Sequence, residues 1–448
     1  MLPCSFLGKN CLVFGLGISG TATALRLFGE GARVFLADEN EERVRRFSAA
    51  HGALRPFRGE EVDFLFRSPG IPLSHPLVAR LRDAGARITG ETELTLSRLP
   101  CPALGVTGSN GKSTVAALTA HLLRAGGYTA HAGGNLGESL LSRLGEIGPH
   151  HLAVLELSSF QLEDLSPHLA RSAILNVAED HLDRHGTKEA YFAAKRRILS
   201  GMRVLPIGEE FAPLVTEETV LFSATVPEEE AHARYPRHPL YLLDDGFVIF
   251  RRGEGRRILF PRSHFLLRGL PFAEDLLCAL ALCHGLLSPA ALARGAASFR
   301  GLPHRARRVA VGDGLAFFDS SIDTSPSRTA ATLSLFSDGA GEYAPPTVIL
   351  SGDSKGASLL PLARAVRKGA RGAVLLGEAI LPLLPHLEGF PIERAATMRE
   401  AVRLAAQMAK KQNASVLLSP GGTSFDLYPN FEERGRDFER CAREYLKL

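Results

Sequence analysis

Short apolar runs alternate with helix-like stretches along much of the chain. In the first group, an apolar run over 11–14 leads into Gly15-x-Gly17-x-x-Gly20, a glycine pattern found in tight turns between a strand and a helix. A helix-like stretch over 21–28 follows, and a second apolar run over 33–37 ends at Asp38. This order predicts a strand–helix–strand unit.

A second group begins with a strand predicted over 103–107. The near-continuous apolar runs 152–156 and 173–177 are typical of parallel strands that are covered on both faces. From about 204 to 265 the pattern changes to short strands separated by turn residues, and a hairpin is predicted over 241–250. We expect a small β-rich part of the same domain there.

A third group again alternates strands and helices. The predicted strands cover 347–350, 373–376 and 415–418, and the predicted helices cover 360–367, 398–410 and 433–446. Together the three groups predict an α/β protein with domains at 1–93, 94–300 and 301–448. We expect a Rossmann-like N-terminal domain, a central parallel sheet of the P-loop ATPase type and a Rossmann-like C-terminal domain.

Composition agrees with a cytoplasmic protein of several domains. At about 150 residues per domain, 448 residues are enough for three domains. The net charge is only +4 and is spread along the chain, which argues against nucleic acid as the main partner. The six cysteines form no C-x-x-C pair, as expected of reduced thiols. We see no signal peptide and no apolar run near the length of about 20 residues that spans a bilayer. A monomer without membrane insertion is expected.

The strongest chemical pattern is Gly108-Ser109-Asn110-Gly111-Lys112-Ser113-Thr114. It lies between the predicted strand 103–107 and a predicted helix over 113–124, where curled backbone amides can surround phosphate oxygens. Lys112 can reach the β- and γ-phosphates, and Ser113 or Thr114 can hold Mg²⁺. Val106 stands where the strict Walker pattern has glycine, so this is a shortened variant. The alternative is a turn that only caps a helix.

The N-terminal glycine pattern is less specific. Asp38 lies 18 residues after Gly20, near the spacing expected for an acidic residue on a ribose hydroxyl. A pyrophosphate could bind at this helix N-terminus, from NAD or from a nucleotide-sugar. A tight structural turn is the alternative.

Acidic and histidine side chains follow two of the central strands. Glu156 ends one strand, and the other is followed by Glu179, Asp180, His181, Asp183 and His185. Because ligands bind at the carboxyl ends of parallel strands, these groups indicate Mg²⁺ beside a triphosphate, with a solvated charged loop as the alternative. On local chemistry alone, Lys195 is interpreted as part of a basic surface face of a helix.

Four motifs in this order resemble the Mur ligase family. They are Gly108–Thr114, Glu156-Leu-Ser-Ser-Phe-Gln161, Asn176-Val-Ala-Glu-Asp-His-Leu-Asp183 and Gly301-Leu-Pro-His-Arg305. Further motifs resemble its D-glutamate-adding branch: Gly15–Gly20, Ser68-Pro-Gly-Ile71, Ser419-Pro-Gly-Gly-Thr-Ser-Phe-Asp426 and Asn430-Phe-Glu-Glu-Arg-Gly435. The resemblance covers essentially the whole chain.

The resemblance implies a UDP-binding domain, an ATPase domain and an amino-acid-binding domain. It implies that ATP, as co-substrate, activates UDP-N-acetylmuramoyl-L-alanine as an acyl phosphate, which the amine of D-glutamate then attacks. Two Mg²⁺ ions and a carbamylated lysine are expected. The implied catalytic residues are Lys112, Glu156, His181 and Lys195, and the implied metal ligands are Ser113, Glu156, His181 and Lys195 as its carbamate.

Carried over by position, the remaining implied contacts fall into three sets. ATP would contact Gly108, Ser109, Asn110, Gly111, Lys112, Ser113, Thr114, Arg305 and Asp319. The UDP-substrate would contact Ile18, Ser19, Asp38, Ser68, Gly70 and Asn135. D-Glutamate would contact Lys355, Ser424 and Phe431.

The chain departs from the family pattern at two places. Ala273-Glu274-Asp275-Leu276-Leu277 stands where the family usually has His-Asn-x-x-Asn, whose amides contact adenine. Asp319-Ser320-Ser321 stands where it usually has Asn-Asp-Ser. Either the aspartate near the ribose is displaced by one residue, or Asp319 takes its place. These departures predict a nucleotide site that selects less strictly for ATP.

Three other functions are considered. A related amide ligase would share the ATPase core, but a folylpolyglutamate-type enzyme would not need a nucleotide-binding first domain. A nicotinamide-dependent oxidoreductase would use Gly15–Gly20 and leave Gly108–Thr114 unexplained. A non-catalytic nucleotide switch would release phosphate without an acceptor carboxylate and an amine.

Overall fold

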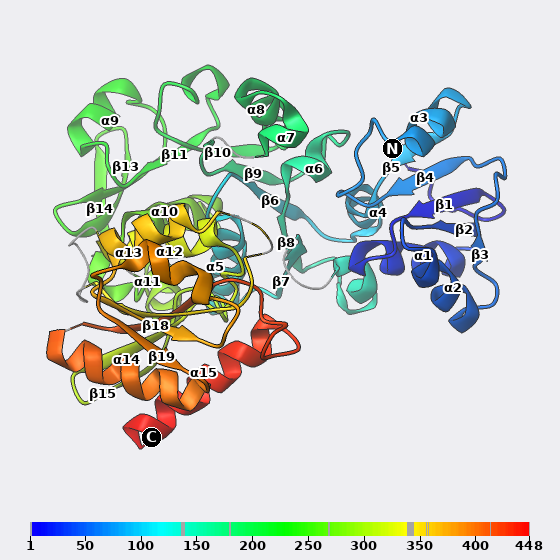
Figure 1. The fold of residues 1–448 in the computed structure, drawn as a ribbon. Coiled ribbons are helices and arrows are strands. Elements are labelled where there is room, and N and C mark those ends of the chain that lie inside the picture. Colours follow the sequence, from blue (N-terminus) through cyan, green and yellow to red (C-terminus); the bar gives the residue numbers. More distant parts are fainter. Residues whose placement is uncertain are drawn as a thin grey trace. The chain divides into compact units, whose positions relative to one another are not determined.

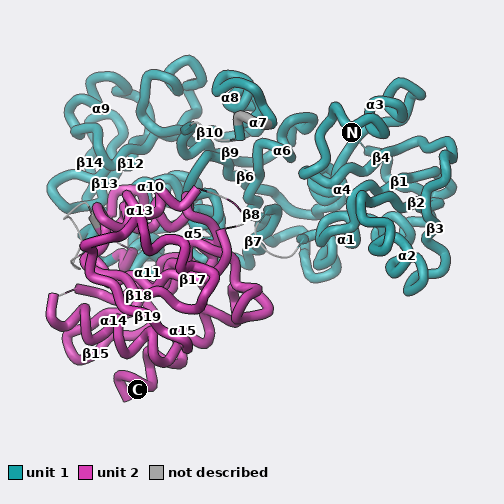
Figure 2. The backbone as a smooth tube through the Cα atoms, viewed as in Figure 1, with its two compact units in different colours: residues 1–264, 274–297 teal, residues 265–273, 298–448 magenta. Residues whose placement is uncertain are grey.

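The computed structural model describes residues 2–135, 139–178, 181–267, 269–337, 345–354, 356, 358–412 and 414–447, without the side chains of residues 182 and 183. The described chain contains three sheets (Figure 1) and is divided into two compact units (Figure 2). One unit comprises residues 1–264 and 274–297 and holds the first two sheets. The other comprises residues 265–273 and 298–448 and holds the third sheet.

The first sheet has five parallel strands in the order β3-β2-β1-β4-β5. Its strands are β1 (Asn10–Phe14), β2 (Arg33–Ala37), β3 (Arg55–Pro56), β4 (Phe64–Arg67) and β5 (Arg87–Thr89), and its helices are α1 (Ile18–Gly29), α2 (Glu41–Ala50), α3 (Pro76–Asp83) and α4 (Glu91–Arg98). Alternate residues of β1 pack into two separate cores, Cys11 and Val13 in one, Leu12 and Phe14 in the other. Because the strand order reverses between β1 and β4, a crevice for a ligand is expected beyond their carboxyl ends.

The second sheet has nine strands in the order β14-β13-β12-β11-β10-β9-β6-β8-β7. Its strands are β6 (Ala103–Thr107), β7 (Ala130–Gly134), β8 (Leu152–Glu156), β9 (Arg171–Ile174), β10 (Met202–Pro206), β11 (Val220–Ser223), β12 (Leu240–Asp244), β13 (Phe247–Arg252) and β14 (Gly255–Pro261). The pairs β12–β13 and β13–β14 are antiparallel. Strand β6 lies between β8 and β9, so the segments that follow these three strands meet at one edge.

Helices and short 3-10 turns connect the strands of this sheet. They are α5 (Lys112–Ala125), η1 (Leu140–Glu146), α6 (Ser159–Leu162), α7 (Leu182–His185), α8 (Lys188–Arg196), η2 (Ala212–Leu214), α9 (Glu228–Arg234), η3 (Arg262–His264), α10 (Leu270–Leu282) and α11 (Pro289–Ser298). Within the described residues, no helix is both long and apolar enough to cross a membrane.

The third sheet has six strands in the order β15-β16-β20-β17-β18-β19. Its strands are β15 (Arg307–Gly312), β16 (Leu315–Asp319), β17 (Thr347–Ser351), β18 (Gly372–Leu376), β19 (Ile392–Ala395) and β20 (Val416–Gly421). Its helices are α12 (Pro326–Ser337), α13 (Leu360–Gly369), α14 (Met398–Gln412) and α15 (Phe431–Leu446), with a 3-10 turn η4 (Leu381–Leu387). Strands β15 and β16 pair antiparallel.

The predicted fold class is confirmed, with two refinements. The β-rich part continues the central sheet. Strands β10, β11 and β12 extend it in parallel, and the hairpin strand β13 runs antiparallel to its two neighbours β12 and β14. Strand β9 ends at Ile174 rather than 177, because the chain beyond it turns to bond the neighbouring loop. The three sheets fall within the predicted ranges 1–93, 94–300 and 301–448, and those domain boundaries stay a prediction.

Candidate active site

The phosphate loop begins where the fully buried strand β6 ends and closes at the first turn of α5. Gly111 has φ +81°, a left-handed conformation that side chains disfavour. The Lys112 ammonium donates to the carbonyl oxygens of Gly108 at 3.0 Å and Ser109 at 2.9 Å, so it lies folded over the loop. The N-terminal amides of a helix lack intrahelical acceptors, and here they are offered beside a cation. The geometry fits a polyphosphate.

Asn176, two residues after the neighbouring strand β9, holds this loop in shape. Its side-chain oxygen accepts hydrogen bonds from the amides of Ser109 at 3.1 Å and Asn110 at 2.9 Å. The Ser109 hydroxyl bonds the backbone of Ala178 and lies 3.2 Å from the hydroxyl of Tyr191. The loop is therefore fixed before any nucleotide binds.

Replacement of Gly111 by alanine is expected to weaken ADP binding by about tenfold or more. A Cβ there would lie 2.1 Å from a carboxylate oxygen of Asp275, and the left-handed backbone adds strain of about 1–2 kcal/mol, where 1.4 kcal/mol corresponds to tenfold. Titration calorimetry with ADP would measure the change. Gly127→Ala is the matched control, because Gly127 has φ +95° but open space around it, at the other end of α5. Equal affinity of Gly111→Ala and the wild type would contradict the prediction.

A buried carboxylate at the end of β8 fits a metal ion. Glu156 is 2% exposed, and its Oε1 accepts a hydrogen bond from the Asn135 amide at 3.3 Å. Its Oε2 has no hydrogen-bond partner among the described residues. A buried carboxylate oxygen without a donor is costly unless a cation binds there. Since β6 and β8 are neighbours, Glu156 and Ser113 follow adjacent strands, as the predicted Mg²⁺ site requires.

No three His, Cys, Asp or Glu side chains converge as a metal site in the part of the chain that the structure describes. The predicted ligand set contains only two side chains of that kind, Glu156 and His181. Its other members are the Ser113 hydroxyl and the modified Lys195. The ligand roles of all four stay a prediction.

Lys195 lies in the interior and not on the surface, so the local interpretation is wrong. It is 1% exposed, on the inner face of α8. Its ammonium donates to the Gly108 carbonyl at 2.7 Å and lies 4.3 Å from the centre of the Tyr191 ring. The surface interpretation failed because the basic residues of the helix do not share one face: Arg196 and Arg197 are exposed while Lys195 points beneath the phosphate loop.

The histidines lie near the same tyrosine. His181 is exposed, and its ring lies 4.8 Å from that of Phe160 and 6.3 Å from that of Tyr191. His185 contacts the Ser159 hydroxyl at 3.1 Å, and burial lowers the pKa of its imidazole. The predicted residues Glu179 and Asp180 lie outside the described residues.

The two turns predicted to bind the UDP-substrate meet in the first sheet. The Ser68 hydroxyl donates to the Gly15 carbonyl at 3.0 Å, and a Cβ at Gly15 would collide with it. Ile18 is 72% exposed at the start of α1, and Gly70 is exposed as well. Asn135 reaches the edge of the second sheet beside Glu156.

Asp38 stabilises the turn that joins β1 to α1. Its carboxylate accepts hydrogen bonds from the amides of Leu16 at 2.6 Å and Asn40 at 2.9 Å, and Arg43 lies at 3.2 Å. Burial raises the pKa of this carboxyl, but the hydrogen bonds outweigh it and the pKa lies below its ordinary value. A contact between the Asp38 carboxylate and a ribose hydroxyl would form in addition to these hydrogen bonds within the protein.

The predicted site residues of the second unit lie in the third sheet or next to it. Asp319 ends β16 and accepts from the Ser321 amide at 2.8 Å, while its other oxygen lies 2.8 Å from the His304 ring, next to Arg305. Phe431 begins α15, and its ring lies 5.9 Å from that of His304. Ser424 is 3% exposed in the loop after β20. Lys355 lies outside the described residues.

Comparisons with known proteins agree with this arrangement. Residues 106–219 match the Mur ligase middle domain. UDP-N-acetylmuramoylalanine--D-glutamate ligase from Nitrosospira multiformis is 35% identical over 97% of this chain and 95% of its own. The ligase of the same name from Symbiobacterium thermophilum is 35% identical over 97% of each chain. The chain belongs to the Mur ligase family.

The fold likeness extends over the whole Mur ligase. The solved structure of MurF ligase from Thermotoga maritima in complex with ADP covers 99% of this chain and 96% of its own, with a TM-score of 0.55 at 15% identity. Mur ligases are ATP-dependent ligases that form amide bonds, and this protein is one of them.

Three residues of this Mur ligase were not assigned a role by sequence reasoning. Asn176 and Tyr191 brace the phosphate loop, as described above. Arg434 is 1% exposed and donates to the carbonyl oxygens of Ser321, Gly422 and Thr423 at 3.0–3.2 Å, and burial lowers its pKa to about 10. It fixes the loop that precedes Ser424. A charged side chain inside a motif was the one available sign, because its partners are distant in sequence.

Proposed function

We propose that this Mur ligase joins D-glutamate to UDP-N-acetylmuramoyl-L-alanine, with ATP as co-substrate and an acyl phosphate as intermediate. The observation that carries the proposal is the full-length likeness to relatives of that name, combined with a phosphate loop flanked by buried Glu156 and Lys195. The product would be an intermediate of peptidoglycan synthesis.

In the first step, an oxygen of the substrate's terminal carboxylate bonds to the γ-phosphorus of ATP, and the bond to the β-phosphate oxygen breaks. Lys112 and the amides of the loop stabilise the charge on the transferring phosphoryl group. Phosphoryl transfer depends mainly on positioning and charge neutralisation, so this equipment is sufficient. In the second step, the amine of D-glutamate attacks the acyl carbon, loses a proton, and phosphate leaves.

Two Mg²⁺ ions would neutralise phosphate charge during transfer. Ser113 and Glu156 would hold one ion, and His181 and Lys195, as its carbamate, would hold the other. The buried Glu156 Oε2 without a donor supports the first site. The burial of Lys195 under the loop supports a role for it in the second.

The substrates would occupy the carboxyl ends of the three sheets. The UDP-sugar would be contacted by Ile18, Ser19, Asp38, Ser68, Gly70 and Asn135. ATP would be contacted by Arg305 and Asp319. D-Glutamate would be contacted by Lys355, Ser424 and Phe431. We also place the enzyme in the cytoplasm, as a monomer; all six cysteines are free thiols, which fits a reducing compartment.

Phosphate release tests this function directly. With ATP, Mg²⁺ and UDP-N-acetylmuramoyl-L-alanine, we expect continuous release of phosphate only when D-glutamate is added. L-Glutamate, L-lysine, meso-diaminopimelate and D-alanine are the comparison amino acids. Turnover with one of these and none with D-glutamate would identify a sibling ligase instead. Release without any amine would indicate a nucleotide switch.

A further inference from the structure

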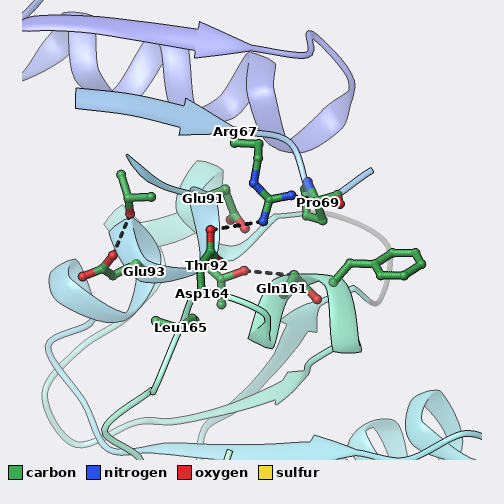
Figure 3. A pocket seen from close by; sticks show the side chains of 11 residues that line it. Arg67, Pro69, Glu91, Thr92, Glu93, Gln161, Asp164 and Leu165 are labelled. Atoms are coloured by element: carbon green, nitrogen blue, oxygen red, sulfur yellow. Dashed lines mark hydrogen bonds and ion pairs between the residues drawn. The ribbon is translucent and has the colours of Figure 1, made fainter. Parts of the chain in front are cut away.

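Two arginines enclose the turn that follows β4. Figure 3 shows the Arg67 guanidinium extending from the end of β4 toward Asp164, beside Pro69. Arg67 donates to Asp164 at 3.1 Å and to the carbonyl oxygens of Pro69 and Ile71. This arginine comes from the first sheet, so it holds the turn to its own strand and to the segment after α6.

Arg184 approaches the same turn from α7, the short helix that follows β9. It donates to the Gly70 carbonyl at 3.0 Å and to those of Pro69 and Ile71 at 3.4 and 3.3 Å. Its Nε and Nη2 form a paired contact with the Glu163 carboxylate at 2.8 and 2.6 Å. The guanidinium also lies 4.9 Å from the centre of the Phe160 ring. The paired contact with Glu163 fixes the guanidinium in one orientation.

The backbone of Arg184 belongs to the segment that carries the histidines. The amides of Arg184 and His185 both donate to the His181 carbonyl, at 3.1 and 3.0 Å, so these residues form a single turn of chain. The side chain therefore links the Ser68–Ile71 turn to the turn that begins at His181. A shift of either turn has to break or lengthen the contacts of one guanidinium, whose side chain is 13% exposed.

We infer that Arg184 is a positioning residue that couples the binding of the uridine-nucleotide substrate at the Ser68–Ile71 turn to the binding of metal-nucleotide beside His181. The inference rests on the proposed function, because that function assigns substrate to Gly70 and metal to His181. Either ligand, once bound, orders its own turn, and through Arg184 it orders the other. Coupling of this kind is reciprocal, so each ligand raises the affinity for the other by one common factor.

The test is a binding cycle on the full chain. Calorimetry would measure the affinity for UDP-N-acetylmuramoyl-L-alanine with and without Mg²⁺ and a non-hydrolysable ATP analogue. In the wild type we expect the metal-nucleotide to tighten substrate binding by about tenfold, within the usual range for coupled sites. In Arg184→Ala the tightening should fall below about twofold, and Arg184→Lys, which keeps the charge but loses the paired contact, should lose most of it.

Arg98→Ala is the matched control. Arg98 forms the same paired contact with Glu30, at 2.8 and 2.7 Å, and both pairs are similarly buried, with side-chain exposures of 10% and 13% against 13% and 14%. Its loss should lower thermal stability comparably and leave the tightening intact. Three results would overturn the inference and leave the proposed function standing. They are tightening that persists in Arg184→Ala, an equal loss of tightening in Arg98→Ala, and no tightening in the wild type. Absence of any uridine-nucleotide binding would overturn the proposed function with it.

Discussion

Lys112→Ala is expected to lower the rate of ATP-dependent ligation by about three orders of magnitude. Loss of one hydrogen-bond donor aimed at developing charge costs about 10²–10³ in rate, and the Lys112 ammonium carries a full positive charge. The ammonium lies over the phosphate loop, at 3.0 and 2.9 Å from two loop carbonyl oxygens. Phosphate release at saturating substrates would give the change in kcat.

Two comparisons separate chemistry from folding. Lys188→Ala removes a lysine that is 43% exposed at the start of α8 and should leave the rate unchanged. Thermal unfolding and ADP titration of Lys112→Ala should show a folded protein that still binds nucleotide, because Asn176 holds the loop independently of the lysine. More than a tenth of the wild-type rate in Lys112→Ala would show that this lysine does not stabilise the transferring phosphoryl group.

The phosphate loop could be predicted from sequence because its determinants are local. An apolar strand, a glycine turn and a helix follow one another without a gap, and the structure has β6 at 103–107 and α5 at 112–125. The hairpin over 241–250 was predictable for the same reason, since turn residues separate two adjacent apolar runs.

Residues whose surroundings come from distant segments could not be predicted this way. Lys195 is buried because α8 packs beneath a loop 87 residues earlier, and its neighbours in sequence say only that the helix is basic. Arg184 contacts a turn 114 residues before it. The end of β9 was misplaced because Val177 is as apolar as a strand residue, although Asn176 already bonds the loop. A role for Lys195 was predicted from the resemblance to the Mur ligase family, and not from the chemistry of this residue and its neighbours in sequence.

Lys195→Ala is expected to lose about a hundredfold or more in activity and to regain part of it with added formate or acetate. If Lys195 acts as a carbamate, its function is that of a carboxylate that binds metal, and loss of a group that supports a metal site costs about 10–100-fold or more. Truncation would leave space beside the Gly108 carbonyl and the Tyr191 ring, where the lysine now lies. A small carboxylate can enter that space and supply the missing oxygens.

The pattern of rescue distinguishes a carbamate from a buried cation. Recovery in Lys195→Ala should saturate with carboxylate concentration and should be absent with ethanol or with methylammonium, which resembles the lysine itself. Lys195→Arg keeps a positive charge but cannot form the carbamate, so it should be inactive and beyond rescue. If instead methylammonium restores Lys195→Ala, or Lys195→Arg is active, the side chain works as a cation under the loop, and the second Mg²⁺ must be held without it.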